Sequence, residues 1–279
     1  MSSVRDLLAE GSMLAGDEAR REAEVLLCAA LDKPRSYLMA WPEAEVAGSL
    51  AQRYRHWLLQ RSKGVPIAYL LGTRDFWSFS LQVNEATLIP RCDTELLVEQ
   101  ALALPLSDTA TVLDLGAGSG AITLALAMER PRWCMLGVER SEKALEVAVA
   151  NARQLGLERV EWRLSDWFSD LAGRRFELIV SNPPYIAEQD VHLDTGDLRF
   201  EPRSALVSGS DGLDDIRSII AQSPEHLEAP GYLLLEHGFE QSGAVRALMT
   251  AIGFSNVASY KDLAGHERVT GGLWSGMAR

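Results

Sequence analysis

The chain has 279 residues, of which 47% are hydrophobic and 24% charged, a globular balance that excludes a disordered or fibrous protein. Its formal net charge of −12 at pH 7 favours proteins and small molecules as partners. Binding to nucleic acid is less favoured, because it relies on Lys and Arg neutralising phosphates. Charged residues interrupt the first 30 residues, and no stretch approaches the ~18 consecutive apolar residues of a membrane span. We therefore expect a cytosolic protein without membrane contact.

The three cysteines also bear on the compartment. Cys28, Cys92 and Cys134 are widely separated and form no C-x-x-C pair. This spacing suits a reducing compartment and argues against a disulfide framework and a zinc site. We expect all three to be packing residues, and we expect no metal.

The first seventy or so residues are predicted to be helical, because apolar residues recur on one face over 17–31 and again over 43–61. Pro66 and Gly72 end this pattern. Residues 76–83 (FWSFSLQV) then have the aromatic and β-branched texture of a strand, which could be half of a hairpin. We predict a small helical domain over 1–73 and a hairpin linker over 74–90.

From residue 111 onward, short apolar runs alternate with helical periods. Strands are predicted at 111–116, 134–139, 160–166, 176–181 and 232–238, with helices ending near Arg130, over 142–155 and near 214–227. Such alternation indicates an α/β domain, here 91–279, whose mainly parallel sheet is covered on both faces. Residues 256–263 and 268–274 could pair antiparallel at one edge and complete a seven-stranded sheet.

A glycine-rich loop, Asp114-Leu-Gly-Ala-Gly-Ser-Gly120, follows the first apolar strand of this domain and precedes a helix. Glycines there let the backbone approach a ligand closely, at the sheet edge where α/β proteins bind ligands. The loop also satisfies the dinucleotide pattern G-x-G-x-x-G/A, so a nicotinamide or flavin nucleotide and a merely structural turn remain alternatives to S-adenosylmethionine. Its D-x-G-x-G-x-G spelling resembles the first motif of class I methyltransferases. In that resemblance Glu139 accepts hydrogen bonds from the ribose hydroxyls.

Two further residues are candidates for an adenine pocket. Asp166 and Trp167 follow the third strand, although Trp167 could be a core residue and Glu139 a solvated acid at a strand end. The predicted cofactor-binding residues are Gly116, Ala117, Gly118, Ser119, Gly120, Glu139, Asp166, Trp167 and Asn182.

The strand at 176–181 runs into Asn182-Pro183-Pro184-Tyr185. Tandem prolines stiffen the backbone and leave carbonyl acceptors without N–H donors, so Asn182 and the carbonyl of Pro183 can hold an NH2 group beside the Tyr185 ring. Gripping both N–H bonds of a planar nitrogen orients its lone pair for methyl transfer and needs neither a metal nor a strong base. We predict Asn182, Pro183 and Tyr185 to be catalytic, and all four residues, including Pro184, to bind the substrate.

This chemistry alone leaves the substrate open between an amide nitrogen and an exocyclic amino group of DNA or ribosomal RNA. A nucleotide-dependent oxidoreductase gives no role to the Asn-Pro-Pro-Tyr motif, and a noncatalytic binding module does not explain the intact glycine loop. Arg199–Arg203 is predicted to help cover the bound substrate, with a solvent loop as the alternative. Thr94 and Glu95 are predicted either to cap a helix or to close the cofactor pocket.

Seven segments spread over nearly the whole chain resemble the release-factor glutamine methyltransferase family, also called PrmC or HemK. They are GTRDF at 72–76, LIPRCDTE at 88–95, DWF at 166–168, SNPPYI at 181–186, FEPRSAL at 200–206, DGL at 211–213 and ERVT at 267–270. Two departures are visible, since Cys92 stands where the family usually has Pro, and Glu139 where Asp is common.

The resemblance implies a seven-stranded, Rossmann-like class I methyltransferase sheet with a small N-terminal helical domain that recognises release factors. It implies N5-methylation of the glutamine in the Gly-Gly-Gln motif of class-1 peptide chain release factors, with S-adenosylmethionine converted to S-adenosylhomocysteine. We expect a monomer that acts on protein and not directly on nucleic acid.

Overall fold

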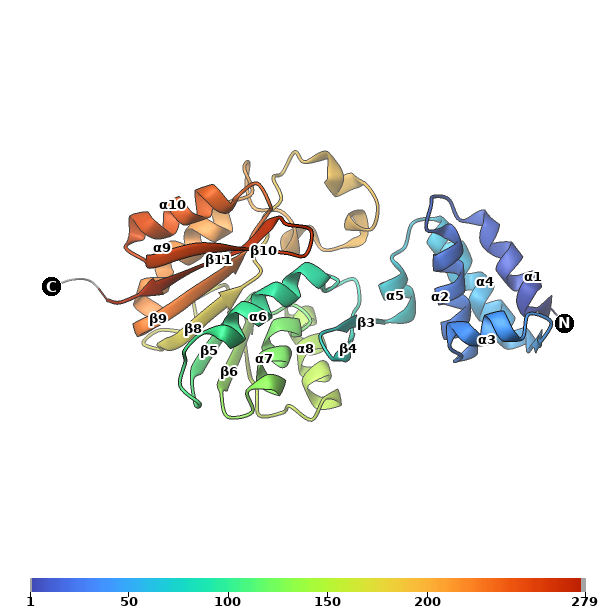
Figure 1. Cartoon of the computed structure of the whole chain (residues 1–279), viewed down its shortest axis with the longest axis horizontal. Coiled ribbons are helices and arrows are strands. Elements are labelled where there is room, and N and C mark those ends of the chain that lie inside the picture. The colour runs from blue at the N-terminus through green and yellow to red at the C-terminus, as the bar shows by residue number, and fades with distance from the viewer. Residues whose placement is uncertain (1, 277–279) are drawn as a thin grey trace. The chain divides into compact units, whose positions relative to one another are not determined.

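The computed structural model describes residues 2–276, which divide into two compact units (Figure 1). One unit comprises the described residues up to Thr73 together with His192–Phe200. The other comprises Arg74–Val191 and the described residues from Glu201 onward. Met1 and residues 277–279, at the outer ends of the two predicted domains, lie outside the described residues.

The first unit is built from helices and one short sheet. Its elements are α1 (Val4–Glu10), α2 (Ala19–Leu31), α3 (Arg35–Ala40), α4 (Gly48–Ser62) and α5 (Ile67–Leu71), with β1 (Ser2–Ser3) paired antiparallel to β2 (Glu45–Val46). The Ser3 hydroxyl accepts from the Asp6 amide at 3.1 Å, and the Asp6 carboxylate accepts from the Ser3 amide at 2.9 Å, so a capping box starts α1. Helix α4 begins later than predicted because residues 45 and 46 form β2.

The second unit begins with a hairpin of β3 (Thr73–Phe76), whose first residue still belongs to the first unit, and β4 (Phe79–Gln82). The strand predicted over 76–83 is therefore interrupted. Trp77 adopts a positive φ of 57° and turns the chain, and because no glycine lies at this position, the sequence does not predict the turn.

The main sheet of the second unit has seven strands. They are β5 (Thr111–Leu115), β6 (Cys134–Glu139), β7 (Glu161–Leu164), β8 (Phe176–Ser181), β9 (Leu227–Glu236), β10 (Ser255–Lys261) and β11 (Glu267–Trp274), in the order β10-β11-β9-β8-β5-β6-β7. Strands β5 to β9 are parallel, whereas β11 is antiparallel to β9 and β10 to β11. The predicted mainly parallel sheet with an antiparallel edge is confirmed.

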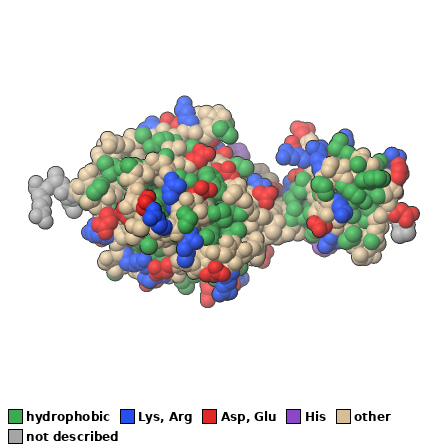
Figure 2. Space-filling model, turned by 60° about the horizontal axis from the view of Figure 1, so that its bottom comes forward, with side chains coloured by type: hydrophobic (Ala, Val, Ile, Leu, Met, Phe, Trp, Pro, Cys, Tyr) green, Lys and Arg blue, Asp and Glu red, His purple; other side chains and the backbone are tan. Residues whose placement is uncertain are grey.

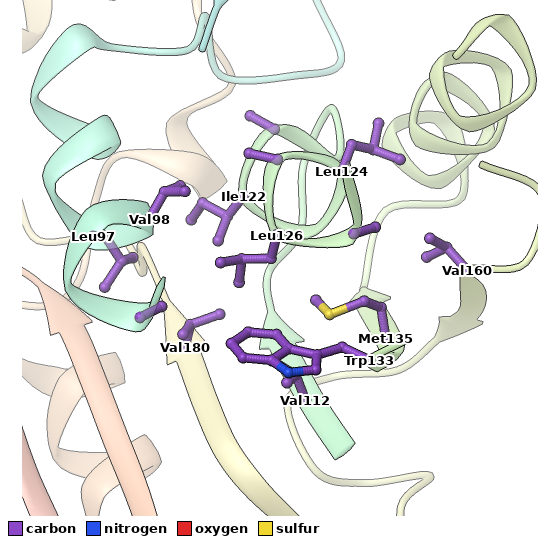
Figure 3. Packing of buried hydrophobic residues seen from close by; sticks show 14 of the residues in the cluster. Leu97, Val98, Val112, Ile122, Leu124, Leu126, Trp133, Met135, Val160 and Val180 are labelled. Carbon is purple, nitrogen blue, oxygen red and sulfur yellow. The ribbon is translucent and has the colours of Figure 1, made fainter. Parts of the chain in front are cut away.

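Helices cover both faces of this sheet. They are α6 (Glu95–Ala103), α7 (Ala121–Glu129), α8 (Glu142–Gln154), α9 (Asp214–His226) and α10 (Ser242–Ile252). Apolar side chains of α6 and α7 pack with Val112 of β5 and Val180 of β8 (Figure 3). On the opposite face Leu113 and Leu115 pack with α9 and α10. This alternation along β5 buries the strand on both sides, as an α/β sheet requires.

The register aligns the carboxyl ends of four strands. Leu115 of β5 lies beside Val138 of β6 and Ser181 of β8, and Ser181 lies beside Leu235 of β9. The next residue along each strand is Gly116, Glu139, Asn182 or Glu236. Four residues from distant parts of the sequence therefore meet at one edge of the sheet.

The cysteines do not all behave as predicted. Cys28 is half-buried, but Cys92 and Cys134 are exposed, so the expectation that all three pack in the core is wrong. Cys134 is the first residue of β6, before the strand enters the core. Within residues 2–276, no helix is long and apolar enough to cross a membrane.

Candidate active site

A cleft opens at the carboxyl edge of the sheet, entirely within the second unit. It encloses about 650 Å³ of empty space, counting its open mouth. The residues that line it include Gly116, Gly118, Glu139, Arg140, Ser141, Ser165, Asp166, Trp167, Asn182 and Pro184, together with Ala86–Leu88, Pro202, Ser204 and Ala205. A cleft of this size suits a ligand as large as a nucleoside with a short tail.

The glycine loop forms the floor of the cleft through its backbone. The amides of Gly116 and Ala117 both donate to the carbonyl of Val138 at 2.9 Å, which turns the chain sharply after β5. Gly116 has a φ of +72°, and a Cβ atom there would lie 3.2 Å from the Trp167 ring. Only glycine fits this turn without strain.

Behind the loop, Asp114 is fully buried and anchors the start of α7. Its Oδ2 accepts from the Thr123 amide at 3.1 Å and from the Thr123 hydroxyl at 2.5 Å. Its Oδ1 has no partner among the described residues. Burial raises the pKa of Asp114 to about 7, against the lowering effect of the two Thr123 hydrogen bonds.

Glu139 faces the cleft from the end of β6. Its Oε2 accepts from the Gly118 amide at 3.0 Å, and its Oε1 accepts from the Ser141 amide at 2.9 Å. Each carboxylate oxygen still has a lone pair for a further donor. The carboxylate is thus held rigidly and can receive a diol, which is the chemistry of a ribose.

Trp167 is held on the wall of the cleft by its indole N–H, which donates to Asp215 Oδ1 at 3.2 Å. Its φ of +48° is strained for a residue with a side chain. The ring also packs against the core that includes α9. Trp167 is therefore partly a core residue and partly a lining residue of the cleft, as each of the two interpretations predicted. Asp166, its neighbour, is exposed at the cleft.

The predicted cofactor residues divide into two groups. Those that line the cleft are Gly116, Gly118, Glu139, Asp166, Trp167 and Asn182. Ala117, Ser119 and Gly120 are buried and shape the turn behind the wall. The Ser119 carbonyl accepts from Asn151 Nδ2 at 2.9 Å, and Asn151 also bonds both backbone groups of Gln82 in the hairpin.

The Asn-Pro-Pro-Tyr motif is fastened to the glycine loop. The Ser181 hydroxyl donates to the carbonyl of Leu115 at 2.7 Å, which links the ends of β8 and β5. Asn182 donates from Nδ2 to the Thr94 hydroxyl oxygen at 3.2 Å, so Oδ1 is the acceptor end of the amide. Thr94 occupies the N-cap position of α6, as the capping interpretation predicted, but among the described residues its side chain makes no capping hydrogen bond. Glu95 accepts from the Trp77 amide at 2.9 Å, and neither residue lines the cleft.

The other motif residues have different positions. Pro184 lines the cleft with Asn182, whereas Pro183 and Tyr185 do not. Tyr185 packs against the core, and its carbonyl accepts from Gln241 at 3.0 Å. Burial, reinforced by the nearby Glu236 carboxyl, raises the pKa of Tyr185 well above its usual value, so its hydroxyl stays protonated.

The segment after the motif contributes a buried acid. Glu201 is buried and accepts from the Ile89 amide at 3.0 Å and from the Arg91 guanidinium. Residues Pro202, Ser204 and Ala205 then line the cleft. The solvent-loop alternative is wrong for this part of Arg199–Arg203, whereas Arg199 belongs to the first unit, where it donates to the Lys63 carbonyl at 2.8 Å.

Comparison with known proteins identifies the family. Residues 6–72 match the PrmC N-terminal domain, and residues 92–209 match the Methyltransferase small domain. The release factor glutamine methyltransferase of Pseudomonas aeruginosa is 54% identical over 275 residues, covering 99% of this chain and all of that protein. The chain belongs to the release factor glutamine methyltransferase family.

Another family member and a more distant structure agree with this assignment. The family member from Escherichia coli is 46% identical over 260 residues, covering 93% of this chain and 94% of that protein. A methyltransferase from Pyrococcus furiosus has the same fold with a TM-score of 0.55 at 15% identity, covering 80% of this chain and 98% of that one. The predicted class I methyltransferase fold and family resemblance are both confirmed.

Sequence reasoning missed several residues that shape the site. Asn151 was not singled out, although a polar residue on the apolar face of the helix predicted over 142–155 is a signal that could have revealed it. Glu201 and Glu236 are buried acids whose surroundings come from segments far away in the sequence, so no local pattern reveals them. Thr94 was considered, but its bond to Asn182 spans 88 positions of the chain.

Proposed function

We propose that the chain transfers a methyl group from S-adenosylmethionine to the N5 side-chain nitrogen of the glutamine in the Gly-Gly-Gln motif of class-1 peptide chain release factors. The observation that carries this proposal is the alignment of the glycine loop, Glu139 and Asn182 at one sheet edge in a member of this family. The product S-adenosylhomocysteine would leave from the same cleft.

The cleft fits the proposed cofactor by its chemistry. Glu139 is oriented by two backbone amides and would accept from the ribose hydroxyls. The backbone turn at Gly116 and Gly118 allows close approach of the amino-acid part, while Asp166 and the Trp167 ring would flank the adenine. When bound, S-adenosylmethionine supplies a methyl group on a positively charged sulfur that leaves as a neutral thioether.

The catalytic contribution of the chain is to orient and polarise the amide. An amide nitrogen is a poor nucleophile because its lone pair is delocalised into the carbonyl. Asn182 Oδ1 and the Pro183 carbonyl would accept the two N–H bonds, which favours the positive charge that develops on nitrogen. The stiff Pro183-Pro184 backbone keeps these acceptors in place, and the nitrogen loses one proton after the transfer. Tyr185 stays a predicted substrate-binding residue through its place in the motif, and because its ring packs against the core and its hydroxyl stays protonated, it brings no charge to the reaction.

The choice of a protein substrate is supported by family membership and by the acidic charge of −12. On the face drawn in Figure 2, acidic and basic side chains are interspersed, without one broad basic area. The alternative, an exocyclic amino group in DNA or ribosomal RNA, would need a basic surface to neutralise phosphates. We further propose that the N-terminal helical unit recognises the release factor in the cytosol.

The test is to incubate the protein with labelled S-adenosylmethionine and, in separate reactions, a release factor, DNA and ribosomal RNA. Mass spectrometry should place the methyl group on the glutamine of the Gly-Gly-Gln motif. Label on nucleic acid alone would refute the proposal.

A variant tests the role of Asn182 in the same assay. Asn182→Ala should lower the rate of transfer by roughly a hundredfold, as when one preorganised polar contact to a transition state is removed. Cofactor affinity, measured by calorimetry, should change far less. The exposed amide variant Gln222→Ala is the control and should keep the wild-type rate. An unchanged rate in Asn182→Ala would remove this residue from the mechanism.

A further inference from the structure

The direction in which Asn182 presents its side-chain amide is decisive for the proposed chemistry. Its oxygen end can accept from the NH2 group of a glutamine, whereas its own NH2 end would repel that group. In the structure Nδ2 donates to the Thr94 hydroxyl at 3.2 Å. Thr94 is only 4% exposed, so water does not compete freely for this bond.

A threonine hydroxyl alone does not determine this direction, because it can both donate and accept. Thr94 accepts from Asn182 only while its own hydrogen is used elsewhere. The partner is Glu236, a buried carboxyl that hydrogen-bonds with the hydroxyls of both Thr94 and Tyr185. The strand register places Glu236 at the end of β9, beside the residue that follows Ser181.

Glu236 is an unusual group to find at this position. It is 1% exposed, and its Oε2 has no hydrogen-bond partner among the described residues. Burying a carboxyl with an unsatisfied oxygen costs stability, and an apolar side chain would avoid that cost. The proposed mechanism assigns no role to Glu236. Its hydrogen bond to Thr94 connects it to Asn182.

The charges around Glu236 come from several elements. Asp93, before α6, and Arg268, on β11, act on it in opposite directions, and Tyr185 faces it from the motif. His237 follows it on the chain and is itself buried, which lowers the pKa of its imidazole. Burial dominates for Glu236 and raises its pKa to about 7. Both protonation states of Glu236 are therefore accessible near neutral pH.

We propose that Thr94 and Glu236 are positioning residues: ionised Glu236 takes the Thr94 hydrogen, so that Thr94 must accept from Asn182 and Asn182 Oδ1 faces the substrate. When Glu236 is protonated, its own O–H can donate to Thr94. The Thr94 hydrogen is then free to point at Asn182, which favours the reversed amide. This inference rests on the proposed function for the identity of the group that Asn182 holds.

The first experiment compares hydroxyl variants in single-turnover methylation of a release factor with saturating cofactor. Thr94→Val should slow the transfer about tenfold, the effect of losing one orienting hydrogen bond, with cofactor affinity unchanged. Thr94→Ser keeps the hydroxyl and should recover most of the rate. Thr250→Val, at an exposed threonine on α10, is the matched control. A wild-type rate in Thr94→Val would overturn the inference.

The second experiment tests Glu236 through pH. In the wild-type protein the single-turnover rate should rise with a midpoint near pH 7, as Glu236 ionises. Glu236→Gln should abolish this step while leaving His237, Asp93, Arg268 and Asp114 in place, so any remaining pH dependence belongs to groups other than Glu236. The same midpoint in both proteins would overturn the role of Glu236.

A third measurement does not depend on the substrate. The ¹⁵N side-chain resonances of Asn182, assigned by their loss in Asn182→Ala, should titrate near pH 7 in the wild type. Their chemical shifts should not change with pH in Glu236→Gln, and they should differ from the wild-type values in Thr94→Val. Chemical shifts that change neither with pH nor in these variants would refute the positioning role. If they respond but no release factor is methylated, the proposed function fails and the positioning of Asn182 stands.

Discussion

Asp114 shows how a single buried carboxyl can shape a ligand site without touching the ligand. Its two hydrogen bonds with Thr123 join the end of β5 to the first turn of α7, and the glycine loop lies between these anchors. The sequence motif marked Asp114 only as part of a cofactor signature. Its partner could not be predicted, because a threonine in an apolar helix has no distinctive pattern.

The raised pKa of Asp114 makes a prediction about stability. The folded chain holds this proton up to about pH 7, while the unfolded chain releases it near the ordinary value of 3.8. The contribution of Asp114 to the free energy of unfolding is therefore complete below about pH 4 and is lost as pH rises towards 7. Asp114→Asn cannot ionise and lacks this dependence.

Urea unfolding of the wild type and of Asp114→Asn at pH 5 and pH 8 measures the contribution of Asp114 to stability. The stability of the wild type minus that of Asp114→Asn should fall by on the order of 2 kcal/mol between the two pH values, since a tenfold difference in proton affinity corresponds to about 1.4 kcal/mol. Subtracting the variant removes the contributions of other groups, such as Glu236. A difference that is constant with pH would contradict the burial of an ionisable Asp114.

At the level of elements, the strongest predictions came from buried strands. The segments containing β5, β6 and β8 are short apolar runs flanked by turns or helices, and their positions agree closely with the structure. Helix α10 was not predicted, although Val245, Leu248 and Met249 repeat on one face, because Ser242 and Gly243 give its start little helix propensity. The turn at Trp77 was also missed, since a tryptophan does not normally mark a positive φ.

Close packing between β6 and β7 predicts the effect of one added methyl group. A Cβ atom at Gly137 would overlap the Trp162 ring, which also lies 3.0 Å from the Cβ position at Gly120 in the cofactor loop. Gly137→Ala should therefore reduce the free energy of unfolding by about 1–3 kcal/mol, as overpacking does. It should also weaken cofactor binding, because Trp162 must move towards or away from the loop.

The matched control is Gly243→Ala on α10, where no atom lies within 4 Å of the added Cβ. Alanine there should be neutral or stabilising by up to about 1 kcal/mol, since glycine is the weaker helix former. Urea unfolding and calorimetric titration with S-adenosylmethionine measure both effects. Equal stability of the two alanine variants would contradict the packing around Trp162.

For the whole molecule, composition and periodicity led us to predict a helical part over 1–73, and that prediction did not include His192–Phe200, which the structure groups with the first unit. That membership involves Arg61, which donates to Glu22 at 2.5 Å and to Asp197 at 2.7 Å. Arg61 and Asp197 are 136 positions apart, and a charged pair so distant leaves no trace in local periodicity. The register that aligns the strand ends could not be predicted either, because the order in which strands pair depends on the complete sheet and not on the sequence of any one strand.

Arg61→Ala tests this connection. The Arg61 and Glu22 side chains are 18% and 19% exposed, so removing the guanidinium leaves a largely buried carboxylate unpaired. The variant should lose about 1–3 kcal/mol of stability and show faster amide hydrogen exchange over 192–200. Arg55→Ala breaks a more exposed pair with Glu10 in the same unit and should cost less than about 1 kcal/mol. Unchanged exchange over 192–200 in Arg61→Ala would contradict the anchoring role.

Because His192–Phe200 belongs to the first unit while the chain on both sides of it belongs to the second, the polypeptide passes between the units three times. A single protease cut between Thr73 and Arg74 would therefore not release a helical fragment from a catalytic one. The nicked protein would remain associated through the ion pair of Arg61 with Asp197 and the hydrogen bond of Arg199 with the Lys63 carbonyl. Splitting the chain between Thr73 and Arg74 would therefore separate residues 192–200 from the rest of the first unit, and the two halves would have to associate to complete that unit.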